Sequence, residues 1–144
     1  MPVARPPFKF SAETRVGFSD TDAQGVVYYG RYMPYFDLAR VEYHRHLDML
    51  RTEPQDRQFV MRAMTVEYHA PARFDDLIEV DVRVQRIGTT SVTYEFAAYL
   101  AGEQLAVTAG QTLVLVDLAE RRPFPVPDWW RKKIRAFEGE DVDG

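Results

Sequence analysis

The sequence predicts an α+β domain in which a curved antiparallel sheet of about five strands wraps around one long helix. Two observations lead to this prediction. Apolar residues from about Gly30 to Leu50 recur every three or four positions, which is the period of a helix. The other regular stretches alternate between apolar and polar residues, as half-buried strands do. Strands that follow one another after a single helix favour an antiparallel sheet.

The expected helix should be deeply buried. Its continuous apolar stripe consists of Tyr32, Tyr35, Phe36, Ala39, Tyr43, Leu47 and Leu50. Met33, Leu38 and Val41 are also apolar but lie off this stripe, where a surface helix would carry polar residues. We therefore expect the helix to be covered on more than one side. Pro34 is compatible with the helix because it falls near the first turn.

The strands of the sheet are expected at 8–18, 59–69, 78–85, 92–98 and 104–117. The third is the clearest, since Ile78, Val80, Val82 and Val84 alternate with charged or polar residues. Gly88 marks the turn that follows it.

A hairpin over 101–103 is expected to join the last two strands. Pro123, Pro125 and Pro127 should end the sheet region, and Asp128 should cap a short helix over 129–137. Trp129 and Trp130 are expected to pack that helix against the sheet or a neighbouring subunit.

The length of 144 residues predicts a single domain, 1–144, with a disordered acidic tail over about 138–144. The absence of cysteine excludes disulfides, a thiol nucleophile and thiolate metal ligands. A net charge of −4 without a basic stripe argues against a nucleic-acid partner. The sequence has no signal-peptide pattern and no stretch near the ~20 apolar residues that cross a bilayer. We therefore expect a soluble, cytoplasmic protein without a membrane partner.

Two carboxylates, Asp20 and Asp22, flank Thr21 where the first strand gives way to the helix. The commoner role of such residues beside a glycine is structural, in a turn or a helix cap. A chemical role is the alternative, because a carboxylate near a helix N-terminus stays ionised and can act as a base or nucleophile. The free N–H groups there can also polarise a substrate carbonyl.

The stretch around these carboxylates resembles a known signature. It reads Phe18-Ser-Asp-Thr-Asp-Ala-Gln-Gly-Val-Val-Tyr-Tyr-Gly-Arg-Tyr32, followed by Tyr35-Phe36 and Ala39-Arg40. This pattern resembles the signature of the 4-hydroxybenzoyl-CoA thioesterase family of hotdog proteins. The stretch from Val66 to Asp76 is similar to a strand-turn segment of that family, and the likeness covers roughly residues 8–125.

The resemblance implies a hotdog fold and the hydrolysis of an acyl-CoA thioester. It implies that Asp22 is the catalytic carboxylate and that the backbone N–H of Tyr29 binds the thioester carbonyl. The implied substrate-binding residues are Gly25, Val26, Val27, Tyr28, Tyr35, Phe59, Arg86 and Thr89. Arg31 stands where many relatives have Asn. Arg86 precedes Ile87-Gly88-Thr89-Thr90, where the best-studied branch has a basic cluster that meets CoA phosphates.

The resemblance also implies a homodimer with active sites at the subunit interface, which often pairs into a homotetramer. No cofactor is expected, and the sequence gives no metal site. His44 and His46 are two residues apart on a helix, so they point roughly 200° apart and would not bind one ion together. His69 has no ligand to pair with.

Several alternatives remain open at this stage. Asp37 or Glu42 could be the catalytic carboxylate, as in a hotdog branch that places it inside the helix. A hotdog hydratase is disfavoured because neither helical histidine occupies the paired His and Asp motif of those enzymes. The main rival is a non-catalytic module that binds acyl-CoA or an acyl carrier. Asp75-Asp76 is expected to be a hairpin turn, and no serine lies in a Gly-x-Ser-x-Gly elbow.

Overall fold

The computed structural model of the chain describes residues 2–50, 57–101 and 103–144. Gly102, in the middle of the expected hairpin, lies outside the described residues. The regular elements are β1 (Phe10–Arg15), α1 (Tyr32–His46), β2 (Arg57–Tyr68), β3 (Leu77–Ile87), β4 (Ser91–Leu100), β5 (Gln104–Asp117), β6 (Arg122–Pro123) and α2 (Asp128–Glu138). Three short 3-10 helices accompany them, η1 (Phe18–Asp20), η2 (Tyr29–Arg31) and η3 (Gly139–Asp141).

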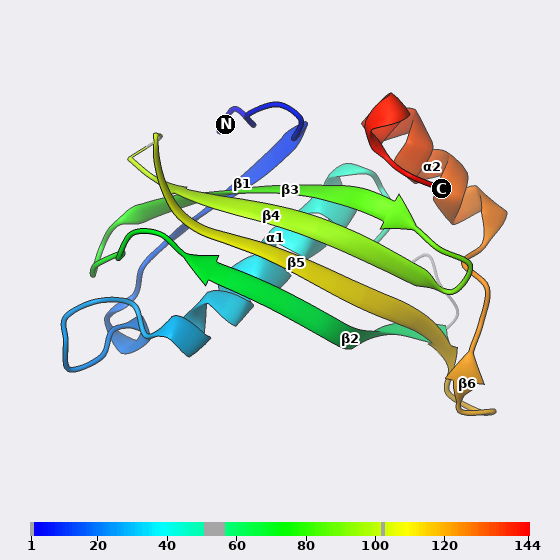
Figure 1. Cartoon of the computed structure of the whole chain (residues 1–144), viewed down its shortest axis with the longest axis horizontal. Helices are drawn as coiled ribbons and strands as arrows, with labels where there is room; N and C mark the ends of the chain where they lie inside the picture. Colours follow the sequence, from blue (N-terminus) through cyan, green and yellow to red (C-terminus); the bar gives the residue numbers. More distant parts are fainter. Residues whose placement is uncertain (1, 51–56, 102) are drawn as a thin grey trace.

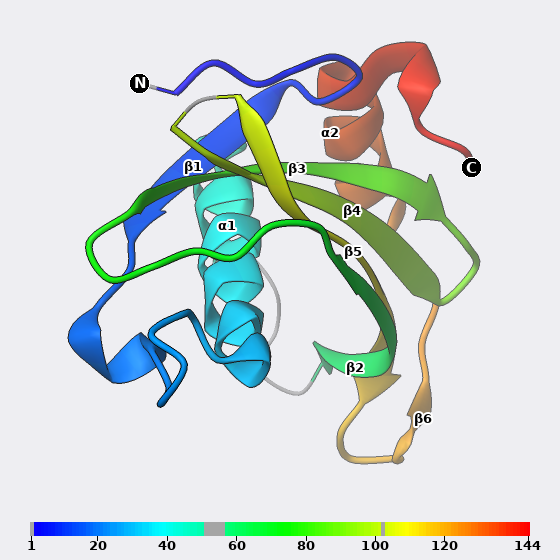
Figure 2. The same cartoon turned by 60° about the vertical axis from the view of Figure 1, so that its left-hand side comes forward.

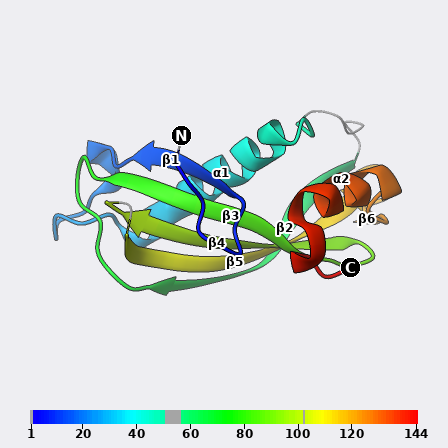
Figure 3. The same cartoon turned by 90° about the horizontal axis from the view of Figure 1, so that it is seen from above.

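The sheet has the strand order β1-β3-β4-β5-β2, with every neighbouring pair antiparallel and with β6 added beside β5 (Figure 1). Figures 2 and 3 show α1 on one side of this sheet, which curves around it. The expected α+β class and the curved antiparallel sheet around one helix are therefore confirmed.

The apolar stripe of α1 faces the sheet. Its five buried residues are Tyr32, Tyr35, Phe36, Ala39 and Tyr43, each no more than 6% exposed. They pack on the inward alternates of the strands, such as Val82 and Phe96. Leu38 and Val41, however, are 41% and 38% exposed. The expectation that α1 is covered on more than one side is therefore wrong for a single chain, because the sheet reaches only one face of the helix.

The boundaries of several elements differ from those expected. β1 is shorter because η1 begins at Phe18, and α1 ends at His46, two residues before Asp48 with its positive φ of 55°. α2 already begins at Asp128, with Pro127 rather than Asp128 at the cap position. Asp128 lies instead in the first turn, where a carboxylate complements the helix dipole.

Two further features of the C-terminal region bear on the sequence-based expectations, of which the one for the prolines is wrong and the packing of Trp129 on a neighbouring subunit stays a prediction. The prolines do not end the sheet at once, because β6 pairs with β5 through Pro123 and Arg122. Trp130 is buried against His44 and Phe59, as expected, whereas Trp129 is 39% exposed.

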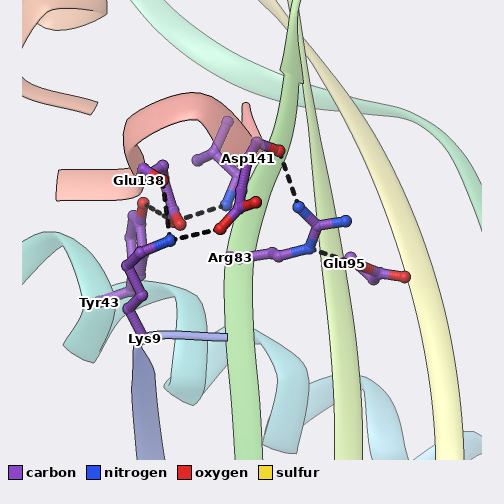
Figure 4. Close-up of polar contacts among 7 residues, drawn as sticks. Lys9, Tyr43, Arg83, Glu95, Glu138 and Asp141 are labelled. Carbon is purple, nitrogen blue, oxygen red and sulfur yellow. Dashed lines mark hydrogen bonds and ion pairs between the residues drawn. The ribbon is translucent and has the colours of Figure 1, made fainter. Parts of the chain in front are cut away.

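The segment 138–144, expected to be a disordered acidic tail, lies against β3 (Figure 4). β1 pairs with β3 only as far as Val82, and the C-terminal segment takes over the same edge. The Glu138 carboxylate accepts the Val84 N–H, and Asp143 exchanges two backbone hydrogen bonds with Gln85 and Ile87. Lys9 bonds both the Glu138 carbonyl and the Asp141 carboxylate. The acidic C-terminal segment therefore forms hydrogen bonds along the free edge of β3. Its acidic composition alone does not reveal this.

No helix in the described ranges is both long enough and apolar enough to span a lipid bilayer.

Candidate active site

The loop between β1 and α1 folds back on itself and presents Asp22 near its tip. Thr21 and Val27 form an antiparallel bridge, and the Asp22 N–H donates to the Val26 carbonyl at 3.0 Å. Gly25 makes the reversal possible, since its φ of 79° is strained for any residue with a side chain. The Asp22 carboxylate is half-buried and accepts the Gln24 N–H at 2.8 Å.

The amides that begin the helical segment follow this loop directly. The Tyr28 N–H donates to the Asp20 carbonyl at 2.9 Å, and the Arg31 N–H donates to the Tyr28 carbonyl. Within the described part of the chain, the Tyr29 and Gly30 N–H groups make no backbone hydrogen bond. Amides in this position at a helix start carry partial positive charge and are ready donors for an oxyanion. They are seven and eight residues from Asp22 in the sequence, across a loop that is tied at its base.

Tyrosine rings surround this helix start. The rings of Tyr28 and Tyr29 lie 4.3 Å apart and are both exposed. A hydrogen bond with the Tyr29 side chain raises the pKa of the Tyr28 hydroxyl, and the nearby charge of Asp22 adds to this effect. Tyr68, at the end of β2, donates its hydroxyl to the Tyr29 carbonyl at 2.8 Å.

Asp20, the other carboxylate of the motif, is fully engaged. Its side chain accepts hydrogen bonds from the Tyr35 hydroxyl, the Gly17 N–H and the Arg31 guanidinium. Although partial burial works in the opposite direction, these donors hold the pKa of Asp20 below its usual range. Asp20 is thus held by three donors, whereas the half-buried Asp22 carboxylate accepts the Gln24 N–H of its own loop.

The other residues of the loop divide into packing and surface positions. Val27 is buried, and its N–H donates to the Ala72 carbonyl at 2.8 Å, whereas Val26 is half-buried. Gly30 has the Tyr28 ring directly over it, since an added Cβ would lie 2.9 Å from that ring. Tyr35 is buried beneath the loop, with its ring edge-on to Tyr32.

Phe59 does not join this group within one chain. It lies nine residues from Tyr68 along β2, which corresponds to about 30 Å of strand. There it packs on Trp130 and lines a cavity of about 130 Å³ together with His44 and Met49.

Arg86 and Thr89 also lie far from Asp22 in the single chain. They are exposed around the β3–β4 turn, at the opposite end of the molecule from the Asp22 loop (Figures 1 and 3). Both line an open hollow of about 550 Å³ with Arg131 and Arg135 of α2. The Arg131 guanidinium is occupied by the Gly88, Thr89 and Val126 carbonyls.

The alternative carboxylates of α1 are held in ion pairs on the helix itself. Asp37 pairs with Arg40 at 3.0 Å, and Glu42 pairs with Arg45 at 3.2 Å. No group of three or more potential metal ligands occurs among the residues that the structure describes.

Sequence reasoning missed Arg31 and Tyr68 as neighbours of the site. In the sequence Arg31 stands out only as a departure from related proteins, and its pairing with Asp20 spans eleven residues. Tyr68 comes from a strand 39 residues away from Tyr29, and its aromatic character alone gives no signal.

Comparisons with known proteins place these features in context. A model of the thioesterase-like superfamily matches residues 16–134. The acyl-CoA thioester hydrolase YbgC of Escherichia coli O6:H1 is 35% identical over 120 residues, covering 82% of this chain and 90% of that protein. The acyl-CoA thioesterase YbgC of Haemophilus influenzae is 32% identical over 130 residues, covering 88% and 92%.

Among solved structures, a thioesterase of Thermus thermophilus complexed with coenzyme A and Zn is similar with a TM-score of 0.82. The two chains are 29% identical, and the match covers 94% of this chain and 99% of the other. A member of the thioesterase superfamily from Jannaschia sp. CCS1 has a TM-score of 0.83 at 23% identity, covering 94% and 86%, which bears on the fold alone. The expected hotdog architecture is confirmed by these likenesses.

Proposed function

Because the chain belongs to the thioesterase-like superfamily, we propose that it hydrolyses an acyl-CoA thioester to a free carboxylate and CoA. Relatives that are 32% and 35% identical over most of their length carry this activity in their names. The observation that supports it most is the loop closed by the Thr21–Val27 bridge. It carries the half-buried Asp22 carboxylate and leads directly to the Tyr29 and Gly30 amides, which make no backbone hydrogen bond among the described residues.

The proposed chemistry needs few groups because a thioester carbonyl is electrophilic. The Tyr29 N–H holds the carbonyl oxygen and stabilises the negative charge that develops on it. In one route Asp22 takes a proton from water, the hydroxide attacks the carbonyl carbon, and the C–S bond breaks as the thiolate recovers the proton. In the other route an Asp22 oxygen attacks, the thiolate leaves, and water hydrolyses the resulting anhydride.

The neighbours of these groups would shape the approach of the substrate. Gly25 keeps the tip of the loop free of a side chain, and Val26, Val27 and Tyr28 lie between the carboxylate and the amide along the chain. We propose that Gly25, Val26 and Tyr28 line the path of the thioester and that the buried Val27 supports them from the core.

A dimer would account for the residues that lie far from Asp22. β2 stands at one end of the strand order, and its Val60 and Met61 are 43% and 44% exposed. Leu38 and Val41 of α1 are exposed as well. We propose that a second copy covers these apolar residues and brings its own Phe59, Arg86 and Thr89 toward the Asp22 site. Arg86 would then meet the CoA phosphates, with Thr89 beside it.

The test is thiol release measured with a chromogenic thiol reagent over acyl-CoA esters of different chain length. We expect steady turnover by the wild type and a loss of about 10²–10⁴ in kcat for Asp22→Asn. Asp75→Asn is the matched control, because Asp75 is an exposed turn carboxylate with a positive φ that Asn tolerates. Turnover that survives Asp22→Asn would contradict the mechanism.

The same assay separates the enzyme from a non-catalytic acyl-CoA binding module. Such a module would bind acyl-CoA tightly, as measured by calorimetry, while the wild type released no thiol from any ester of the panel.

A further inference from the structure

We propose that Asp20, Arg31 and Tyr35 form a clamp that positions Asp22 and the Tyr29 amide relative to each other. This inference rests on the proposed function. The three residues act as positioning residues, since they work through the loop and do not need to touch the substrate. Tyr35, which the family resemblance implied as a substrate contact, takes part through its hydroxyl group.

The Asp20 side chain is the centre of the clamp. One oxygen accepts from Arg31 Nε and Nη2 at 3.2 and 3.0 Å. The other accepts from the Tyr35 hydroxyl at 2.7 Å and from the Gly17 N–H at 2.9 Å. The Asp20 side chain therefore connects Gly17 at the start of the loop with Arg31 at its end and Tyr35 in α1. Arg31 and Tyr35 are four residues apart and therefore share one face of the helix start.

The backbone of Asp20 also connects the clamp to the two proposed reacting groups, Asp22 and the Tyr29 amide. Its carbonyl accepts the Tyr28 N–H at 2.9 Å, so Tyr29 provides the first unoccupied amide. Asp22 follows Asp20 by two residues, and its own N–H is fixed to Val26 on the returning strand of the loop. A shift of Asp20 would therefore move the carboxylate and the amide together with the loop.

The clamp should matter more for the rate than for stability. The Arg31 side chain is 46% exposed and that of Asp20 is 14% exposed, and Asp20 keeps its Gly17 and Tyr35 donors when Arg31 is replaced, so we expect the loss of Arg31 to change the free energy of unfolding little. Catalysis is more sensitive, because a displacement of about 1 Å of a reacting group can cost about 10²-fold in rate. The clamp therefore predicts a fall in kcat that is not matched by a loss of folded protein.

The kinetic test compares Arg31→Gln, Asp20→Asn and Tyr35→Phe with the wild type. We expect kcat to fall about 10- to 100-fold in Arg31→Gln while KM changes less than about threefold and the melting temperature stays within a few degrees. Arg31→Lys should recover part of kcat, since it retains a cation for Asp20. The double variant Asp20→Asn/Arg31→Gln should be no slower than the slower single variant, because both remove the same interaction.

Arg45→Gln is the matched control, since Arg45 makes an exposed ion pair with Glu42 within α1 and the substitution removes the same kind of charge. It should turn over like the wild type. A wild-type kcat in Arg31→Gln, or a rise in KM alone, would overturn the clamp, and the latter would mark Arg31 as a substrate contact.

Amide hydrogen exchange tests the clamp without any substrate. The Asp22 and Tyr28 amides, which both donate within the loop, should exchange faster in Arg31→Gln than in the wild type or Arg45→Gln. Unchanged exchange at both amides would overturn the clamp. A wild type that releases no thiol but shows the faster exchange in Arg31→Gln would refute the proposed function and leave the clamp intact.

Discussion

His44 illustrates how a single side chain at the edge of the core sets a pH dependence. Its ring packs against Trp130, and its Nε2 is 2.6 Å from the Tyr94 hydroxyl. Burial lowers the pKa of His44 to about 4, and the charge of Arg40 acts in the same direction. The ring is therefore neutral in the folded protein at pH values where the unfolded chain, with a histidine pKa of about 6.5, already binds a proton.

We predict that the free energy of unfolding falls between about pH 6.5 and about pH 4 because of this histidine. The unfolded state binds more protons there, so stability is lost as the pH decreases, by at most about 1.4 kcal/mol per pH unit. His44→Gln should flatten the profile, and His46→Gln, at an exposed position, should retain it. Urea unfolding at several pH values measures the free energy of unfolding of both variants. If this free energy falls with decreasing pH as steeply in His44→Gln as in the wild type, the prediction is refuted.

At the scale of elements, the C-terminal segment depends on one buried carboxylate. Glu138 is completely buried at the end of α2 and accepts the Tyr43 hydroxyl at 2.5 Å and the Val84 N–H at 3.2 Å (Figure 4). Its second oxygen has no hydrogen-bond partner among the described residues. Burial raises the pKa of Glu138, although its hydrogen bonds oppose this effect. The carboxylate thus links α1, β3 and α2 at the cost of poor solvation.

Replacing Glu138 separates hydrogen bonding from charge. Glu138→Gln keeps an oxygen for Tyr43 and Val84, so its free energy of unfolding should stay within about 1 kcal/mol of the wild type. Glu138→Leu leaves the Tyr43 hydroxyl and the Val84 N–H without an acceptor. Its free energy of unfolding should therefore be about 2–4 kcal/mol lower than that of Glu138→Gln. Chemical denaturation gives both values. A leucine variant as stable as the glutamine variant would show that these hydrogen bonds do not hold the segment.

Much of the fold could be predicted from the sequence because the period of apolar residues within each element shows whether that element is a helix or a strand and which of its faces is buried. The alternation of Ile78 to Val84 and the helical stripe from Tyr32 to Tyr43 reflect contacts with one buried face, which each element encodes by itself. Asp22, Gly25 and Tyr29 likewise belong to a contiguous motif, and the expected turn around Gly25 is confirmed by its positive φ.

The features that escaped prediction are those set by tertiary contacts. Asp20 and Arg31 resemble ordinary surface charges until the loop brings them together. Composition places Glu138 in an acidic tail because it does not report that Tyr43 and Val84 offer this carboxylate their donors. The positions of Phe59 and Arg86 at the far ends of long strands likewise follow from the strand order and not from the motif.

At the scale of the whole molecule, the exposed apolar residues of α1 and β2 make assembly testable. We predict a mass in light scattering of twice or four times the chain's 16.7 kDa. The double variant Leu38→Lys/Val60→Lys should be a monomer, because a dimer would have to bury two lysine charges per chain in the proposed interface. It should also lose most thiol release, since the partner's residues no longer reach the Asp22 site.

Leu118→Lys controls for the loss of an exposed leucine, because Leu118 is 47% exposed in the turn between β5 and β6. It should retain the mass and the activity of the wild type. A wild type that is monomeric and fully active would contradict the proposed dimer.

The most direct test of the account is a crystal structure with an acyl-CoA analogue in which a methylene group replaces the thioester sulfur. We predict that its carbonyl oxygen lies about 2.7–3.1 Å from the Tyr29 nitrogen. The Asp22 carboxylate, or a water bound to it, should lie about 3–3.5 Å from the carbonyl carbon. A carbonyl group bound elsewhere, with Asp22 turned away from it, would contradict the proposed hydrolysis.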